Sequence, residues 1–123
     1  MKNAINWFEI PVKNFDKAKT FYETLFGSTM PLMEAMGMKS AFFPADLKNG
    51  GVGGCIIEGK GYEPTTNGSL VYLNGGDDLS VPLSKVEQAG GKIILPKTGI
   101  GPHGFMAHFE DTEGNKIGLH SMK

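Results

Sequence analysis

The sequence predicts an α+β fold made of two βαβββ modules, over residues 1–60 and 68–123. First, short runs of alternating apolar and polar residues, typical of strands, recur along the chain. Second, two stretches with apolar residues at three- and four-residue spacing, typical of helices, each follow such a strand. Third, three more strand-like runs follow each helix, so the same order of elements occurs twice at a period of about sixty residues.

The first module begins with a strand over residues 6–12, where Phe8 and Ile10 alternate with Trp7 and Glu9. A helix follows, because Asn14 is suited to cap its N-terminus and Gly27 to end it. The apolar stripe that this helix should bury consists of Ala18, Phe21, Tyr22 and Leu25. The remaining strands are expected over residues 28–36, 38–43 and 52–58.

The second module follows a short glycine-rich connector over residues 59–68. Its first strand is predicted at residues 69–73, and its helix has Ser80 as a candidate N-cap. Gly90 and Gly91 should end that helix. The last three strands are expected over residues 92–95, 105–110 and 116–121.

The final two strands form a predicted hairpin with two different faces. The turn over residues 111–115 contains Gly114 and Asn115, which tolerate positive φ. One face should pack under a helix and comprises Phe105, Ala107, Phe109, Ile117 and Leu119. The other face comprises Met106, His108, Glu110, Lys116, Gly118 and His120. Whether this second face lines a pocket is the functional question.

Composition narrows the classes of function. The chain of 123 residues, 40% of them hydrophobic, has enough apolar material for one globular core. A formal net charge of -1 gives no reason to expect nucleic acid or an acidic membrane as a partner. The single Cys55 and the absence of a charged-then-apolar leader favour a cytoplasmic protein.

The order of elements and three segments resemble the vicinal-oxygen-chelate superfamily, which groups glyoxalases, bleomycin-resistance proteins and extradiol dioxygenases. The segments are WFEIPVKNFDKAKTFYETLFG, VYLNGGDDLSVPLSKVEQAGGKI and FEDTEGNKIGL. The resemblance implies a single domain whose two modules form curved mixed sheets around a cleft, with the helices outside. Thr112 departs from the proline that usually follows Asp in the last turn.

The resemblance also implies where a metal would bind. Metal-using members place His, Glu or Gln at one cleft-facing point in the first and last strands of each module. In this chain those points fall on Trp7, Gly54, Ser69 and Gly118, and a one-residue slip would give Phe8, Cys55, Leu70 and Leu119. With a single hydroxyl or a single thiol among apolar side chains and glycines, neither set can make the ligand set that zinc, nickel, iron or manganese needs. We therefore expect no metal and no other cofactor.

The polar residues of the cleft-facing strands remain as candidates for chemistry. His108 and His120 should lie on neighbouring strands and could orient a ligand or move a proton, or they could be partly exposed surface histidines. Glu9 could act as an acid or base, or it could form a salt bridge or a structural hydrogen bond. The catalytic candidates are Glu9, His108 and His120. The expected ligand-binding residues are Trp7, Glu9, Met106, His108, Gly118 and His120.

Three other features have simpler interpretations. Residues 99–104 spell G-x-G-x-x-G but precede a strand, so they indicate a flap at the cleft mouth with His103 at its tip, and not a dinucleotide site. Cys55 should point toward the helices as a small core residue. Met30, Met33, Met36 and Met38 cluster around one hairpin, where they could line a ligand site, fill the core or contact a second copy.

These observations predict a glyoxalase/bleomycin-resistance-like protein that binds a small organic molecule in the cleft between its modules without a catalytic metal. If it is an enzyme, it would be a lyase or isomerase that uses acid–base side chains. The alternative is a metal-dependent lyase or dioxygenase with unusual ligands, and a structural or partner-binding protein is a third class. A homodimer is expected, because small members of the family commonly pair and two modules leave strand edges that need covering.

Overall fold

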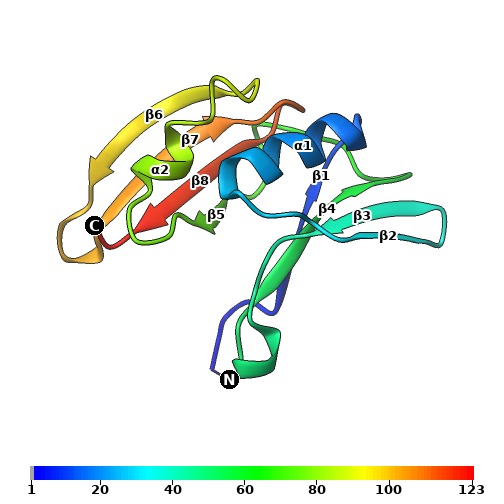
Figure 1. Ribbon diagram of the computed structural model, residues 1–123, viewed down its shortest axis with the longest axis horizontal. Helices are drawn as coiled ribbons and strands as arrows, with labels where there is room; N and C mark the ends of the chain where they lie inside the picture. The colour runs from blue at the N-terminus through cyan, green and yellow to red at the C-terminus, as the bar shows by residue number, and fades with distance from the viewer. Residues whose placement is uncertain (1) are drawn as a thin grey trace.

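The computed structural model describes residues 2–123 and contains two four-stranded mixed sheets (Figure 1). The N-terminal sheet has the order β1-β4-β3-β2, with β1 Trp7–Pro11, β2 Leu32–Ala35, β3 Met38–Phe42 and β4 Gly53–Glu58. The C-terminal sheet has the order β5-β8-β7-β6, with β5 Val71–Asn74, β6 Lys92–Gly99, β7 Phe105–Glu110 and β8 Lys116–Ser121. Each sheet pairs its first and last strands in parallel, so the predicted βαβββ modules are both present.

The first helix, α1, spans Phe15–Phe26 and has the predicted ends. The Asn14 side chain accepts a hydrogen bond from the Lys17 amide, and Gly27 ends the helix with a φ of 61°. The second helix, α2, spans only Ser80–Leu83, after which the chain continues in turns. The prediction that Ser80 caps this helix was wrong, because Ser80 is helical and its amide donates to the Asp78 carboxylate at 2.8 Å.

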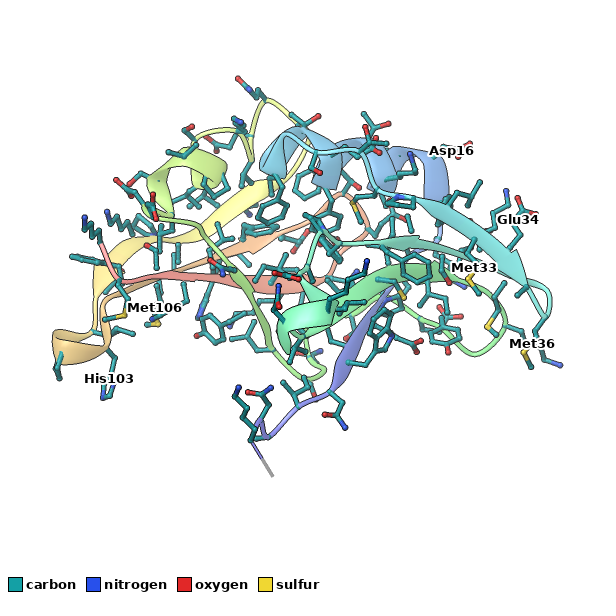
Figure 2. The ribbon with its side chains drawn as sticks, turned by 60° about the horizontal axis from the view of Figure 1, so that its bottom comes forward. Asp16, Met33, Glu34, Met36, His103 and Met106 are labelled. Atoms are coloured by element: carbon teal, nitrogen blue, oxygen red, sulfur yellow. The ribbon has the colours of Figure 1, made fainter. Side chains whose placement is uncertain are left out.

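Both helices lie on one side of the two sheets (Figure 2). Helix α1 contacts both sheets: the Phe21 ring lies 5.8 Å from the Phe109 ring of β7, and the Tyr22 ring lies 5.2 Å from the Phe43 ring after β3. Buried side chains of both modules therefore form one core. The predicted stripe of α1 is buried, and so are Ile10, Phe109 and Leu119.

The turn between β7 and β8 ties the end of the chain to its beginning. The Glu113 carboxylate accepts hydrogen bonds from the amides of Lys13 (2.8 Å) and Asn14 (2.6 Å), just before α1. The Asn115 amide group donates to the Pro11 carbonyl at 2.7 Å. A carboxylate at a helix N-terminus satisfies free amides and interacts favourably with the helix dipole.

Asp111 organises the same turn from inside. Its buried carboxylate accepts hydrogen bonds from the Tyr22 hydroxyl (2.7 Å) and from the amides of Glu113 and Asn115 (2.8 and 2.9 Å). Burial, followed by the charge of Asp111, raises the pKa of Tyr22 well above 10.0, so its hydroxyl stays protonated and donates. Gly114 has the expected positive φ of 90°, but Asn115 does not, so the role of Asn115 is hydrogen bonding.

Two backbone hydrogen bonds fix how the modules correspond. The Val12 amide donates to the Ile57 carbonyl, and the Gly75 amide donates in the same way to the His120 carbonyl. Counting back from these bonds along the parallel pairs, Glu9 corresponds to Tyr72 and Trp7 to Leu70.

In the last strands, the same count makes Cys55 the counterpart of Gly118. The sequence-based match of Gly54 with Gly118 was therefore one residue out of register. Gly54 faces the core, where a Cβ added to it would lie 2.4 Å from the Phe8 ring. A shift of one residue reverses the face of a strand, so the correction changes which residues look away from the helices.

Strand β2 is an exposed edge strand of the N-terminal sheet. Met33 and Met36 lie exposed near the end of the molecule opposite His103 and Met106 (Figure 2). Met30 is buried in the core, so the methionine cluster is divided between core and surface.

None of the helices in residues 2–123 is long and apolar enough to span a membrane.

Candidate functional site

The side of the sheets away from the helices carries the residues that could bind a ligand or take part in a reaction. We call its two parts the N-terminal open face, defined by Trp7, Glu9, Phe42, Gly53, Cys55 and Tyr62, and the C-terminal open face, defined by Tyr72, Met106, His108, Gly118 and His120. Strand alternation separates both sets from the core, as Trp7 at 40% exposure and Phe109 at 0% illustrate.

The centre of the C-terminal open face is a pair formed by Tyr72 and His108. The Tyr72 hydroxyl oxygen lies 2.7 Å from His108 Nε2, and its ring centroid lies 5.6 Å from the imidazole. The Met106 sulfur is 3.6 Å from the same hydroxyl. In either tautomer of neutral histidine, one proton lies between the phenol oxygen and Nε2.

Gly118 positions this pair. Tyr72 and Gly118 are partners in the parallel β5·β8 ladder, and the Tyr72 ring lies over the glycine. A Cβ added to Gly118 would stand 2.4 Å from Tyr72 Cδ1, which no side chain could accept without moving the ring. The glycine therefore lets the ring lie flat enough for its hydroxyl to reach the neighbouring strand.

The electrostatic environment keeps His108 neutral. Burial lowers its pKa from 6.5, and the positive charge of Lys116 on the adjacent strand lowers it further. A neutral imidazole can accept a proton, which an imidazolium cannot. The pair therefore has the composition of an acid–base group.

His120 holds the predicted flap. Its Nε2 lies 2.6 Å from the His103 carbonyl oxygen, in the 3₁₀ turn Gly101–His103 (η2) that joins β6 to β7. The G-x-G-x-x-G stretch thus precedes a strand, as its sequence context predicts. An open hollow of about 740 Å³ lies between this turn and β5, with Tyr72, Asn74, His103, Met106 and His120 in its lining.

The N-terminal open face is aromatic and acidic. The Trp7 indole leans across β4 at Gly53 and meets the Phe42 ring edge-on at 5.9 Å. The Tyr62 hydroxyl, from the connector, donates to Glu9 Oε1 at 3.0 Å.

Cys55 belongs to this face and not to the core side, so the sequence-based orientation was wrong. It pairs with Glu9 in the β1·β4 ladder and with Phe42 in the β3·β4 ladder. Cys55 is 2% exposed, and burial followed by the charge of Glu9 raises the pKa of its thiol to about 11. A thiol that stays protonated at neutral pH is a poor nucleophile.

The two open faces lie on different sheets and carry different side chains. Among residues 2–123, no hydrogen bond joins Trp7 or Glu9 to His108 or His120. Between the sheets lies a cavity of about 530 Å³ whose lining includes Phe8, Phe26, Phe43, Val71 and Leu73 but no charged side chain. A smaller cavity of about 190 Å³ connects Glu9 with Lys116 along the same seam.

The residues do not fit the metal that the resemblance implies. With the corrected register, the equivalent points of the four strands are Trp7, Cys55, Leu70 and Gly118. One thiol among an indole, an isobutyl group and a glycine cannot form a tetrahedral or octahedral ligand set. Within the described residues, no three His, Cys, Asp or Glu side chains are grouped closely enough to hold an ion.

Sequence reasoning placed Cys55 on the wrong face and did not name four further members of the open faces: Phe42, Gly53, Tyr62 and Tyr72. Tyr72 lay inside a predicted strand, and its alternation with Val71 and Leu73 could have placed it opposite Gly118. Phe42 could have been found in the same way from β3. Tyr62 carried no signal, because its position depends on how the connector folds back on β1.

Two mixed sheets of βαβββ modules with both helices on one side are the architecture that the resemblance implies. The chain belongs to the Glyoxalase/Bleomycin resistance protein/Dioxygenase superfamily, whose family model matches residues 4–119. A glyoxylase-like domain-containing protein of Didymella fabae is 31% identical over 125 residues, which cover 94% of this chain and 91% of that protein.

Solved structures agree with this fold. Glyoxalase I from Zea mays matches with a TM-score of 0.69 and 17% identity, over 98% of this chain and 48% of that protein, so the chain spans about half its length. A glyoxalase/bleomycin resistance protein from Albidiferax ferrireducens matches with a TM-score of 0.68 and 17% identity, over 95% and 97% of the two chains. At these identities the likeness concerns the fold.

Proposed function

We propose that this protein binds a small, oxygen-bearing organic molecule on its open face, centred on the Tyr72–His108 pair, without a catalytic metal. The observation that carries the proposal is the 2.7 Å contact between the Tyr72 hydroxyl and His108 Nε2 beside an open hollow of about 740 Å³. Ligand sites are commonly hollows of this size with a few polar groups that fix orientation.

The residues that line the hollow suit a ligand with both apolar and hydrogen-bonding groups. Met106 offers an adaptable apolar surface, and the Tyr72 hydroxyl can donate to a ligand carbonyl or hydroxyl oxygen when Nε2 holds the proton. His120 is tied to the flap carbonyl, so its role would be to hold the mouth of the hollow. A family member of this kind is a binding protein, or a lyase or isomerase if His108 moves a proton.

The test is binding of a panel of small 2-oxo and 2-hydroxy compounds, followed by the imidazole NMR signals of His108. We expect Tyr72→Phe to weaken binding roughly five- to ten-fold, which corresponds to the loss of one hydrogen bond of about 1 kcal/mol. Tyr62→Phe is the matched control, because it removes a tyrosine hydroxyl from the N-terminal open face and not from the C-terminal one. Compounds that shift only signals of the N-terminal open face would overturn the proposal.

Catalysis has its own readout. Proton transfer by His108 predicts exchange of deuterium from D₂O into the C–H group next to the carbonyl of a bound 2-oxo compound. His108→Gln should abolish this exchange while binding persists. Binding without exchange in the wild-type protein would identify a binding module.

The homodimer expected from the sequence stays a proposal. Leu32, Met33 and Met36 expose more than half of their surface on and beside the edge strand β2, and a second copy could cover them.

A further inference from the structure

The N-terminal open face contains a carboxylate, that of Glu9, which forms no ion pair within the described residues. The ion pairs within residues 2–123 join Lys13 to Glu63, Lys19 to Glu23 and Lys97 to Asp78, and none of them involves Glu9. The exposed Glu9 side chain has one hydrogen-bond partner in this part of the chain, the Tyr62 hydroxyl at 3.0 Å. A carboxylate can accept about four hydrogen bonds, so most of its capacity is unused.

Aromatic rings stand beside this carboxylate. Trp7 is two residues before Glu9 on β1, so both side chains leave the same face of the strand. Tyr62 reaches Glu9 from the connector, and Phe42 supports the indole edge-on at 5.9 Å. Gly53 makes room for the indole, since a Cβ there would lie 3.2 Å from Trp7 Cζ3.

This combination selects one class of ligand. Aromatic faces carry negative electrostatic potential, and a neighbouring carboxylate adds a full negative charge, so both attract cations and disfavour anions. A metal ion would require several oxygen, nitrogen or sulfur ligands, which this face does not gather. An alkylammonium ion is large and weakly hydrated, and it needs only ring faces and one counter-charge.

We propose that Trp7, Tyr62 and Glu9 form a binding site for an organic ammonium group. Trp7 provides the principal ring face, Glu9 the counter-charge, and Tyr62 holds the carboxylate beside the indole through its hydroxyl. This site lies on the other sheet from the Tyr72–His108 pair, so it does not depend on the function proposed above.

The experiment compares choline with 3,3-dimethyl-1-butanol, its uncharged carbon isostere, at constant ionic strength. Trp7 is the single tryptophan of the chain, so its fluorescence reports directly on this face. We expect a saturable change in emission with choline and binding at least about five-fold weaker for the isostere. Equal responses to the two compounds, or none to choline, would overturn the proposal.

Variants separate charge from shape. Glu9→Gln should weaken choline binding by about ten-fold, whereas Glu34→Gln, an exposed carboxylate on β2 (Figure 2), should leave it unchanged. Trp7→Phe lacks the fluorophore, so its weaker binding is followed by the NMR signal of the choline methyl groups. Circular dichroism checks that each variant is folded.

Other outcomes would contradict the site. Choline binding by Glu9→Gln at wild-type strength would show that the carboxylate is not the counter-charge. Trp7 emission that changes with protein concentration but not with choline would show that a second copy covers this face. Neither result bears on the Tyr72→Phe test, because Tyr72 lies in the C-terminal sheet.

Discussion

The two modules share a backbone plan but carry different chemistry on their open faces. Where the N-terminal sheet has Glu9 and Cys55 in its parallel strand pair, the C-terminal sheet has Tyr72 and Gly118 at the corresponding positions. One face is therefore aromatic and acidic, whereas the other carries a phenol–imidazole pair. The pairing of the strands therefore determines where side chains project from each sheet. The identity of a few of these side chains determines what each open face can bind.

The modules also differ in how firmly their last turn is anchored. The β7–β8 turn is organised by buried Asp111, but the β3–β4 loop of the first module has only exposed Asp46, which accepts from the Asn49 side chain at 2.7 Å. The first-module loop is therefore a surface connection, whereas the second-module turn is part of the core.

Replacing the two aspartates should give the largest difference between the modules. Asp111→Ala leaves the buried Tyr22 hydroxyl and two amides without their acceptor, so we expect a loss of about 3 kcal/mol in unfolding free energy. Asp46→Ala should cost less than about 1 kcal/mol, because the side chain is exposed. Urea unfolding of both variants measures the comparison, and equal losses would contradict it.

A smaller difference is expected at the two glycines that lie under aromatic rings. Gly54→Ala pushes against Phe8, which is half-buried and packs against Phe43 at 5.4 Å, so about 1–3 kcal/mol should be lost. Gly118→Ala pushes against Tyr72, which is 45% exposed and whose ring can turn outward, so less than about 1 kcal/mol should be lost.

The main effect of Gly118→Ala should instead be the loss of the hydrogen bond between the Tyr72 hydroxyl and His108 Nε2. Urea unfolding measures stability for both glycine variants, and the imidazole NMR signal of His108 reports whether the contact persists. A larger loss of stability for Gly118→Ala than for Gly54→Ala would reverse the assignment of faces.

The smallest effect concerns the charge near His108. Because Lys116 contributes to the lowered pKa of His108, Lys116→Gln should move that pKa upward, toward 6.5, in an NMR titration. Lys85→Gln, on the helix side of the module, is the control and should leave the pKa of His108 unchanged. An unaltered pKa in Lys116→Gln would mean that burial alone causes the shift.

The same shift predicts a direction for stability against pH. The pKa of His108 in the folded chain lies below its value of 6.5 in the unfolded chain, so the folded state binds fewer protons. The stability that neutral His108 provides is therefore complete above pH 6.5 and falls as the pH drops toward the folded pKa. His108→Gln should remove this part of the acid sensitivity, measured by urea unfolding at a series of pH values.

Alternation was sufficient to predict much of the fold. Strands β7 and β8 have the predicted bounds, and the caps of α1 at Asn14 and Gly27 are those read from the sequence. The orientation of the strand around Gly54 was harder to predict. Consecutive glycines at 53 and 54 carry no apolar or polar signal that would show which residues face the core. The helix α2 was shorter than predicted, since Pro82 and the turns after Leu83 limit it to one turn.

The candidate sites could be predicted from the sequence less completely than the fold. His108 and Met106 could be placed on one face by parity, but their partner Tyr72 comes from a strand about thirty-five residues earlier, and only the ladder register brings it there. Tyr62 depends on a connector without periodicity. Contacts between distant segments follow from tertiary pairing, which local patterns do not contain.

The anchoring of α1 by Glu113 has a consequence for the order in which the chain can mature. The amides of Lys13 and Asn14 are satisfied by a carboxylate 99 or 100 residues further along the chain. During synthesis, the first module therefore emerges long before the group that completes its helix start and the Phe109 ring that covers Phe21. Its exposed apolar surface stays uncovered until the β7–β8 hairpin has been synthesised, so the two modules acquire their final packing together only after that point.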